Sequence, residues 1–195
     1  MRKEPFLIGK YYHIYNRGTD KRIIFSDVFD LQRFIQSMEE FNVVDPTGGI
    51  YNNKFKNREK FRISSPKLVD FVCYCLNPNH YHFILSPLVD NGIEKFMQKL
   101  GAGYTKYFNE KYQRSGVLFQ GRYKSIYISS DKYLMYLSAY INLNDHIHRL
   151  RPWRSKSMDK GVKLFWKSSW GEYLGKKKEN FCNKSIILDR YKDVN

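Results

Sequence analysis

The chain has 195 residues, which suits one ordinary domain with an appendage better than two full domains. Its 34 Lys and Arg outnumber its 19 Asp and Glu, and the net charge of +15 favours nucleic acid as partner, with a basic protein that binds none as the alternative. Three cysteines without a CxxC pair argue against a disulfide framework. The sequence shows neither a signal peptide nor about 18 consecutive apolar residues, so we expect a soluble, intracellular protein.

The first third of the chain predicts a strand, a helix and a long loop. Residues 10–17 alternate as a strand, and residues 28–41 carry apolar side chains at helical spacing behind a possible cap at Ser26. Residues 45–67 are rich in Pro, Gly, Asn and Lys, which predicts a polar loop. One face of the first strand is expected to carry Tyr11, His13, Tyr15 and Arg17.

The middle of the chain predicts a hairpin and two further helices. Residues 69–76 and 80–85 are apolar runs on either side of an Asn-Pro-Asn turn, and a helix begins near Gly92. A short strand near 125–128 precedes a helix that Ser129 or Ser130 can cap. This order predicts an α+β fold, a mainly antiparallel sheet with helices packed on it. We expect one domain over residues 1–150 and a basic, Trp-containing C-terminal extension over 151–195.

His80-Tyr81-His82 is the most specific local signal in the sequence. Residues two apart on a strand point to the same face, so both imidazoles project together while Tyr81 points to the opposite side. Two such rings, about 7 Å apart along the strand, can converge on one metal ion. Taken alone, the pair is at least as consistent with two hydrogen-bonded core histidines.

Tyr140 and Asn144 form the second half of this constellation. Residues four apart on a helix are neighbours on one face. The Asn144 amide oxygen can complete a set of metal ligands with two imidazoles, and the Tyr140 oxygen can attack a phosphate polarised by that metal. The spacing of Tyr133, Tyr136 and Tyr140 is also that of aromatic core residues, so this alternative remains open at the level of sequence.

Other polar residues allow a different metal site. His146 and His148 repeat the HxH spacing and could join His80, His82 or Cys73 around zinc. This idea is weaker because the sequence has neither a CxxC nor an HExxH motif. Cys73 and Cys75, in an apolar strand, are most simply small core residues.

Five segments, in order, resemble the HUH single-tyrosine transposases, specifically the REP-associated tyrosine transposase branch of the insertion-sequence-200-like transposases. The run Asn77-Pro-Asn-His-Tyr-His-Phe-Ile-Leu85 resembles the family's "MPNHFHLLL" segment, and Tyr140-Ile-Asn-Leu-Asn144 resembles its "YIHLNP" segment. The other segments are Tyr12–Gly18, Gly103–Asn109 with Gly116–Ser125, and Trp166–Gly175, which resembles "WSSYxxYLG".

The resemblance implies a ferredoxin-like sheet, a Mg²⁺ or Mn²⁺ ion, and a 5′-phosphotyrosine link to single-stranded DNA that carries hairpins. His80, His82 and Asn144 map to metal ligands, and Tyr140 maps to the nucleophile. We expect a monomer or homodimer, cytoplasmic and nucleoid-associated when bound to DNA, with no membrane partner. The expected DNA contacts are Arg17, Arg122, Lys124 and His13.

Two positions depart from the family pattern. Asp145 replaces a Pro, so the helix can continue and Asp145 or His146 can join the site. Asn77 replaces a Met, a change that we expect to be harmless at a turn. The alternative function is a catalytically inactive, domesticated protein that binds hairpin DNA or RNA. Retention of both histidines, Tyr140 and Asn144 favours the enzyme, because binding alone needs none of them in this arrangement.

Overall fold

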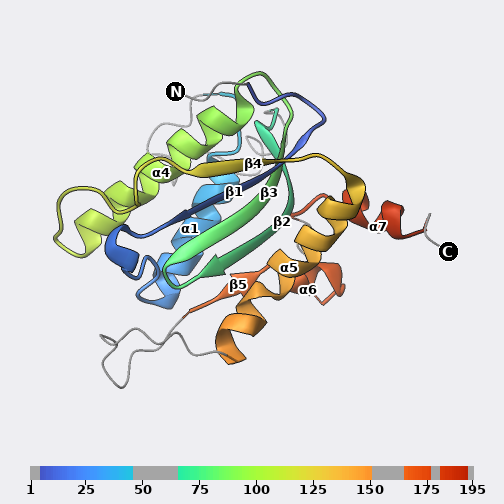
Figure 1. Ribbon diagram of the computed structural model, residues 1–195. Helices are drawn as coiled ribbons and strands as arrows, with labels where there is room; N and C mark the ends of the chain where they lie inside the picture. Colours follow the sequence, from blue (N-terminus) through green and yellow to red (C-terminus); the bar gives the residue numbers. More distant parts are fainter. Residues whose placement is uncertain (1–4, 46–65, 151–164, 177–180, 193–195) are drawn as a thin grey trace.

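A single antiparallel sheet forms the centre of the fold (Figure 1). The computed structural model describes residues 5–45, 66–150, 165–176 and 181–192, and only the backbone at 145–150 and 192. The strands lie in the order β4-β1-β3-β2-β5, and each neighbouring pair is antiparallel. They are β1 (Tyr11–Arg17), β2 (Val69–Asn77), β3 (His80–Pro87), β4 (Lys124–Ile128) and β5 (Lys167–Ser168).

The helices form a layer on each face of the sheet. Two helices, α1 (Val28–Glu40) and α4 (Gly92–Lys111), pack on one face through the larger hydrophobic cluster. A third, α5 (Asp131–Leu150), packs on the other face through a smaller cluster. In Figure 1, α1 lies behind the strands and α5 in front of them. The short elements are a 3-10 helix (Thr19–Lys21), α6 (Trp170–Tyr173) and α7 (Ser185–Lys192).

The alternation of side chains along β3 separates core from surface. Tyr81, Phe83 and Leu85 point to the α1–α4 face and are buried, whereas His80 and His82 point to the α5 face and are partly exposed. Strand β2, beside β3, is buried along almost its whole length, which explains its continuous apolar run. The predicted α+β fold with a mainly antiparallel sheet is therefore confirmed.

The long polar loop predicted at 45–67 lies almost wholly outside the described residues. Its two ends meet, because the Val44 N–H donates to the Pro66 carbonyl oxygen at 2.9 Å. Residues just before it are also close to α4. A Cβ atom on Gly103 would lie 2.6 Å from the Phe41 ring, so glycine permits this approach of α4 to the end of α1.

The described part of the C-terminal extension packs against the sheet. Strand β5 pairs with β2, opposite Cys75 and Leu76. Glu172 is 3% exposed and accepts hydrogen bonds from the Tyr74 hydroxyl and from the Phe181 and Cys182 N–H groups. A buried carboxylate with these partners ties the extension to the core. The predicted boundary at residues 150 and 151 remains a prediction.

Candidate functional site

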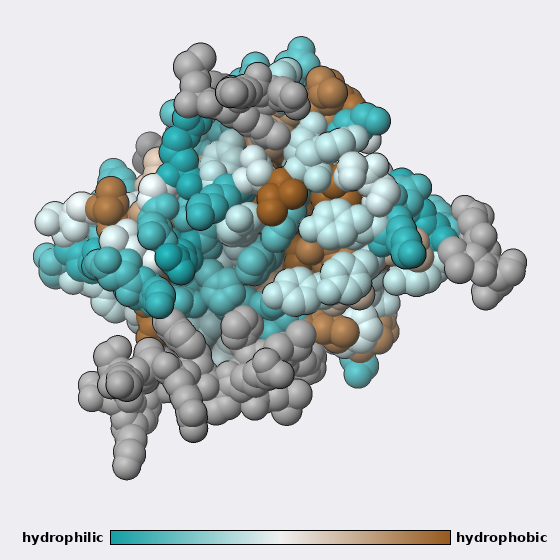
Figure 2. All heavy atoms as spheres, viewed as in Figure 1, coloured by the Kyte–Doolittle hydropathy of each residue, from teal (hydrophilic) through white to brown (hydrophobic). Residues whose placement is uncertain are grey.

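The predicted histidines lie on the sheet face that α5 covers only in part. Tyr15 on β1 stands opposite His82 on β3 and opposite Lys124 on β4, so these side chains share one face. Helix α5 packs over the β2 side of this face, through Leu134, Leu137 and Ile141. Viewed from that side, Figure 2 shows a hydrophilic area over the strands beside a paler area along α5. The site thus combines polar strands with the edge of a helix.

His80 is held in one tautomer by its neighbour Asn79. The His80 Nδ1 atom lies 2.6 Å from the Asn79 Oδ1 atom, and the Asn79 Nδ2 group donates to the Lys21 carbonyl oxygen at 3.2 Å. An amide oxygen only accepts hydrogen bonds, so Nδ1 of His80 carries the proton. Its Nε2 atom therefore keeps a lone pair, the form in which imidazole binds metals.

His82 is anchored in the same way, by His13. The His82 Nδ1 atom lies 2.9 Å from the His13 Nε2 atom, and the rings of His13, Tyr15 and His82 are stacked. Burial lowers the pKa of His13 to about 4, so at neutral pH it is uncharged and its Nε2 atom can accept a hydrogen bond from the His82 Nδ1–H group. Both predicted ligand rings are held through Nδ1, and their centroids are 5.1 Å apart.

Asn144 on α5 reaches the histidines through Asn77. The Asn77 Nδ2 group lies 2.9 Å from Asn144 Oδ1 and 3.1 Å from His80 Nε2. Asn77 is the last residue of β2 and stands opposite His80 in register. The structure thus brings two predicted ligands, His80 and Asn144, to one amide group. It also places Asn77 in this contact, where the sequence had suggested a harmless turn position.

Tyr140 lies on the open side of α5, one turn before Asn144. Its side chain is 42% exposed, and Tyr133 and Tyr136 on the same helix are 38% and 67% exposed. The three tyrosines are therefore not core residues, and that interpretation of their spacing is wrong. Within the described part of the chain the Tyr140 hydroxyl has no hydrogen bond. The phenol is accessible to a large substrate.

A contact with the C-terminal extension fixes α5 on the sheet. The Ser169 hydroxyl donates to Asn142 Oδ1 at 2.6 Å and accepts from the Tyr74 N–H of β2 at 3.0 Å. Ser169 and Asn142 are both buried. This link holds the helix that carries Tyr140 and Asn144. Sequence reasoning did not identify it, although Ser169 lies within the segment that resembles the family's "WSSYxxYLG" tail.

The predicted DNA contacts differ in their surroundings. Arg17, Arg122 and Lys124 are exposed, and the Arg17 guanidinium donates to the Gln120 side chain. Arg122 lines an open groove of about 830 Å³ between α4 and residues 117–123. His13 is 8% exposed and bonded to His82, so it holds a ligand ring. Its role as a DNA contact remains a prediction.

The alternative zinc site gains no support from Cys73. That thiol is fully buried on β2, and burial raises its pKa far above the usual range, which disfavours the thiolate that zinc needs. The side chains of Asp145, His146 and His148 lie outside the described residues. Among described residues, no group of three or more His, Cys, Asp or Glu side chains is arranged so that it could hold a metal ion. A site of two imidazoles and amides uses a different set of donors.

Residues 60–144, which include both histidines, Tyr140 and Asn144, match the family model described as "Transposase IS200 like". Over these residues, the chain is similar to the IS200-like transposases. Its fold is similar to that of a solved structure, "Structure of the REP associates tyrosine transposase bound to a REP hairpin". That likeness has a TM-score of 0.54 at 12% identity and covers 90% of this chain and 85% of that chain.

The family match supports the predicted resemblance, and the structural likeness agrees with the predicted fold class. At 12% identity, the structural likeness concerns the fold. No curated protein matches the chain in sequence. No helix among the described residues is long and apolar enough to cross a membrane.

Proposed function

We propose that this chain is a metal-dependent single-stranded DNA transposase and nickase. It cleaves and rejoins DNA next to hairpins through a 5′-phosphotyrosine intermediate. One observation carries the proposal: His80 Nε2 and Asn144 Oδ1 meet at the Asn77 amide, with His82 beside them and Tyr140 one helical turn away. A phosphate site and a nucleophile are thus carried by two elements that pack together, β3 and α5.

The donor set fits Mg²⁺ or Mn²⁺. His80 offers a ring nitrogen that carries no proton, and Asn144 and Asn77 offer amide oxygens, and Mg²⁺ and Mn²⁺ bind both kinds of atom. The Asn77 Oδ1 atom is buried and has no hydrogen-bond partner among the described residues. His80, His82 and Asn144 are the residues proposed to hold the metal. When bound, it would polarise a phosphate oxygen and neutralise the charge that develops there.

Tyr140 supplies the nucleophile in this proposal. A bond forms between its phenol oxygen and the scissile phosphorus, and the bond from phosphorus to the 3′ oxygen breaks. The phenol loses its proton and the released 3′ hydroxyl gains one, so the step needs no oxidant or reductant. The phosphotyrosine ester keeps the energy of the broken bond, and the reaction can run back onto another 3′ hydroxyl. An exposed phenol suits this role.

The surface around the site suits single-stranded DNA. Tyr133, Tyr136 and Tyr140 form an exposed aromatic row on α5, and unpaired bases stack on such rings. The net charge of +15, with Arg17, Arg122 and Lys124 exposed, suits the phosphate backbone. The solved relative is described as bound to a REP hairpin, and we extend hairpin binding to this chain on that basis.

Covalent capture of DNA tests the proposal directly. Hairpin-bearing single-stranded oligonucleotides are incubated with Mn²⁺ and with wild type, Tyr140→Phe or Tyr136→Phe, then run on a denaturing gel. We expect a slow protein–DNA band with wild type and Tyr136→Phe that is lost with Tyr140→Phe and in EDTA. If only Tyr136→Phe loses the band, Tyr136 and not Tyr140 is the nucleophile. A native-gel shift without any covalent band would favour the inactive binding protein.

A further inference from the structure

Asn77 occupies a fixed place at the centre of the site. It ends β2, is fully buried, and precedes a two-residue turn whose Pro78 carbonyl oxygen accepts from the Ile24 N–H at 2.7 Å. Its Nδ2 group contacts His80 Nε2 at 3.1 Å, Asn144 Oδ1 at 2.9 Å and Cys75 Sγ at 3.5 Å. The backbone around Asn77 is thus pinned, and its amide group lies between two proposed ligands.

The two ligand atoms that meet at Asn77 are both hydrogen-bond acceptors. His80 Nε2 is an acceptor because Nδ1 carries the proton, and Asn144 Oδ1 is an amide oxygen. Two acceptor atoms repel each other unless a hydrogen-bond donor or a cation lies between them. The Asn77 N–H bonds fill that role here, and a metal cation would fill it in the same way.

The oxygen of the same amide has no partner. Asn77 Oδ1 is buried and accepts no hydrogen bond from the described residues, although buried amide oxygens are nearly always satisfied. Its Nδ2 group, in contrast, contacts three acceptors. This imbalance is unfavourable as a purely structural arrangement. It becomes favourable when a cation occupies the space between His80 and Asn144, because the oxygen can then face the cation.

We infer that Asn77 is a metal-site residue of this chain, an inference that rests on the proposed function. Without metal, its amide nitrogen holds His80 and Asn144 together. With Mg²⁺ or Mn²⁺ bound, the amide turns about its last side-chain bond and presents Oδ1 to the ion. The Met of the family pattern would provide neither the donor nor the oxygen. The departure at position 77 thus adds a ligand.

Metal affinity measured without DNA tests this inference. Mn²⁺ is titrated calorimetrically into the full chain and into Asn77→Leu and Asn77→Asp, which are close in size to Asn. We expect Asn77→Leu to weaken Mn²⁺ binding by about tenfold or more, as loss of groups around a metal does. Asn77→Asp adds a charged oxygen and should strengthen it by a similar factor. The difference in melting temperature between Mn²⁺ and EDTA should follow the same order.

Two controls separate the inference from the function beneath it. Asn42→Asp places the same charge at another buried amide, the one bonded to Val69 at the opposite end of β2, and should leave Mn²⁺ affinity unchanged. His82→Ala should weaken Mn²⁺ binding. If it does while Asn77→Leu binds like wild type, the metal site stands and the role of Asn77 is refuted. If wild type binds no Mn²⁺, both ideas fail. Should Asn77→Leu not fold, an Asp variant with no larger Mn²⁺-dependent shift than wild type refutes the inference.

Discussion

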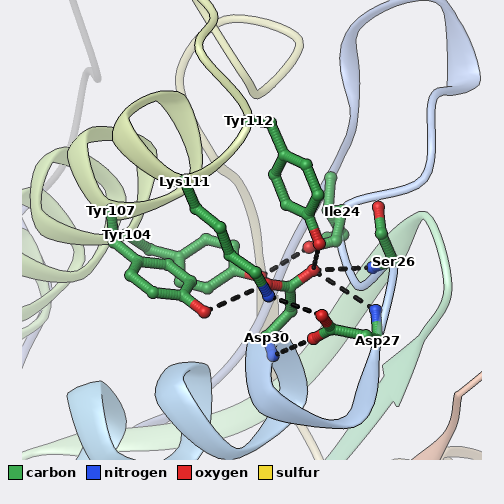
Figure 3. A network of polar contacts seen from close by, with 8 residues as sticks. All are labelled: Ile24, Ser26, Asp27, Asp30, Tyr104, Tyr107, Lys111 and Tyr112. Atoms are coloured by element: carbon green, nitrogen blue, oxygen red, sulfur yellow. Dashed lines mark hydrogen bonds and ion pairs between the residues drawn. The ribbon is translucent and has the colours of Figure 1, made fainter.

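Two buried polar clusters lie on opposite faces of the sheet, and they differ in how completely their members are paired. The first joins α1 to α4 around Asp30, which is fully buried (Figure 3). Its carboxylate accepts from Lys111 at 2.6 Å, from the Tyr107 and Tyr112 hydroxyls at 3.1 and 2.8 Å, and from the Ser26 N–H at 2.8 Å. In Figure 3, the side chains of Tyr107, Lys111 and Tyr112, at the end of α4, converge on this one carboxylate.

The second cluster, around Asn77, is incomplete. His80 Nε2 and Asn144 Oδ1 share one amide nitrogen, while the amide oxygen beside it is unsatisfied within the described structure. The Asp30 cluster holds α1 and α4 together, and the Asp30 carboxylate at its centre already has hydrogen-bond partners. In the Asn77 cluster, by contrast, the atoms that could bind a metal lie close together and are not all satisfied by hydrogen bonds within the described structure. The comparison therefore assigns stability to the Asp30 cluster and ligand binding to the Asn77 cluster, and the two assignments can be tested separately.

Lys111→Met should give the largest effect on stability. It leaves the Asp30 carboxylate buried without its cation, and the loss of one partner of a buried pair costs about 3 kcal/mol at the lower end of the usual range. We take the lower end because Lys111 is 27% exposed and both tyrosines still donate. Chemical denaturation measures this change. Covalent capture of DNA well below the melting temperature should persist.

The matched control lies on the same helix. Lys106 pairs with Glu110 at 3.8 Å, but both side chains are exposed, so Lys106→Met should change stability by less than about 0.5 kcal/mol. Equal losses from the two substitutions would contradict the structural role of the Asp30 cluster. Loss of covalent capture in a folded Lys111→Met protein would contradict the division of roles between the two clusters.

Features that depend only on neighbouring residues could be predicted from the sequence. The shared face of His80 and His82 is a local property, since side chains alternate along any strand. Ser130 as the cap of α5 is equally local, and its hydroxyl accepts from the Tyr133 N–H at 3.3 Å. By contrast, α1 is capped by Asp27 rather than Ser26, because Asp30 completes a capping box with Asp27. Neighbouring candidates for a cap are decided by side-chain geometry.

Contacts between segments that are distant in the chain could not be predicted from the sequence. Helical spacing places Tyr133, Tyr136 and Tyr140 together, but Leu134, Leu137 and Ile141 have the same spacing, and only packing decides which row meets the sheet. The face of the sheet to which the Asn77 side chain points depends on where β2 ends and on the register shift between Phe71 and Cys73. Its contact with Asn144 joins residues 67 positions apart.

Tyr136→Leu should produce an intermediate effect, confined to DNA binding. If unpaired bases stack on the exposed row of α5, loss of this ring costs about 1–3 kcal/mol per base, or roughly 5- to 150-fold in affinity. Fluorescence anisotropy with a single-stranded oligonucleotide measures the change, and Tyr136→Phe should bind like wild type. Tyr127→Leu is the matched control, because Tyr127 is 47% exposed but pairs in register with Tyr12, on the α1–α4 side. Equal losses at both positions would refute a stacking row specific to α5.

The smallest expected effect concerns the charges beside the site. Arg122→Ala with Lys124→Ala removes two exposed cations, one at the groove beside α4 and one opposite Tyr15. If each contacts a phosphate of a single strand, the slope of log affinity against log salt should fall by about 0.7 per contact, so about 1.4 in total. Lys67→Ala with Lys95→Ala removes the same charge elsewhere and should leave the slope nearly unchanged. Equal slopes for the two double variants would mean that net charge alone attracts the DNA. A smaller slope for the Arg122 and Lys124 double variant would place the DNA backbone along the start of β4. This position is beside the Asn77 cluster and away from the Asp30 cluster.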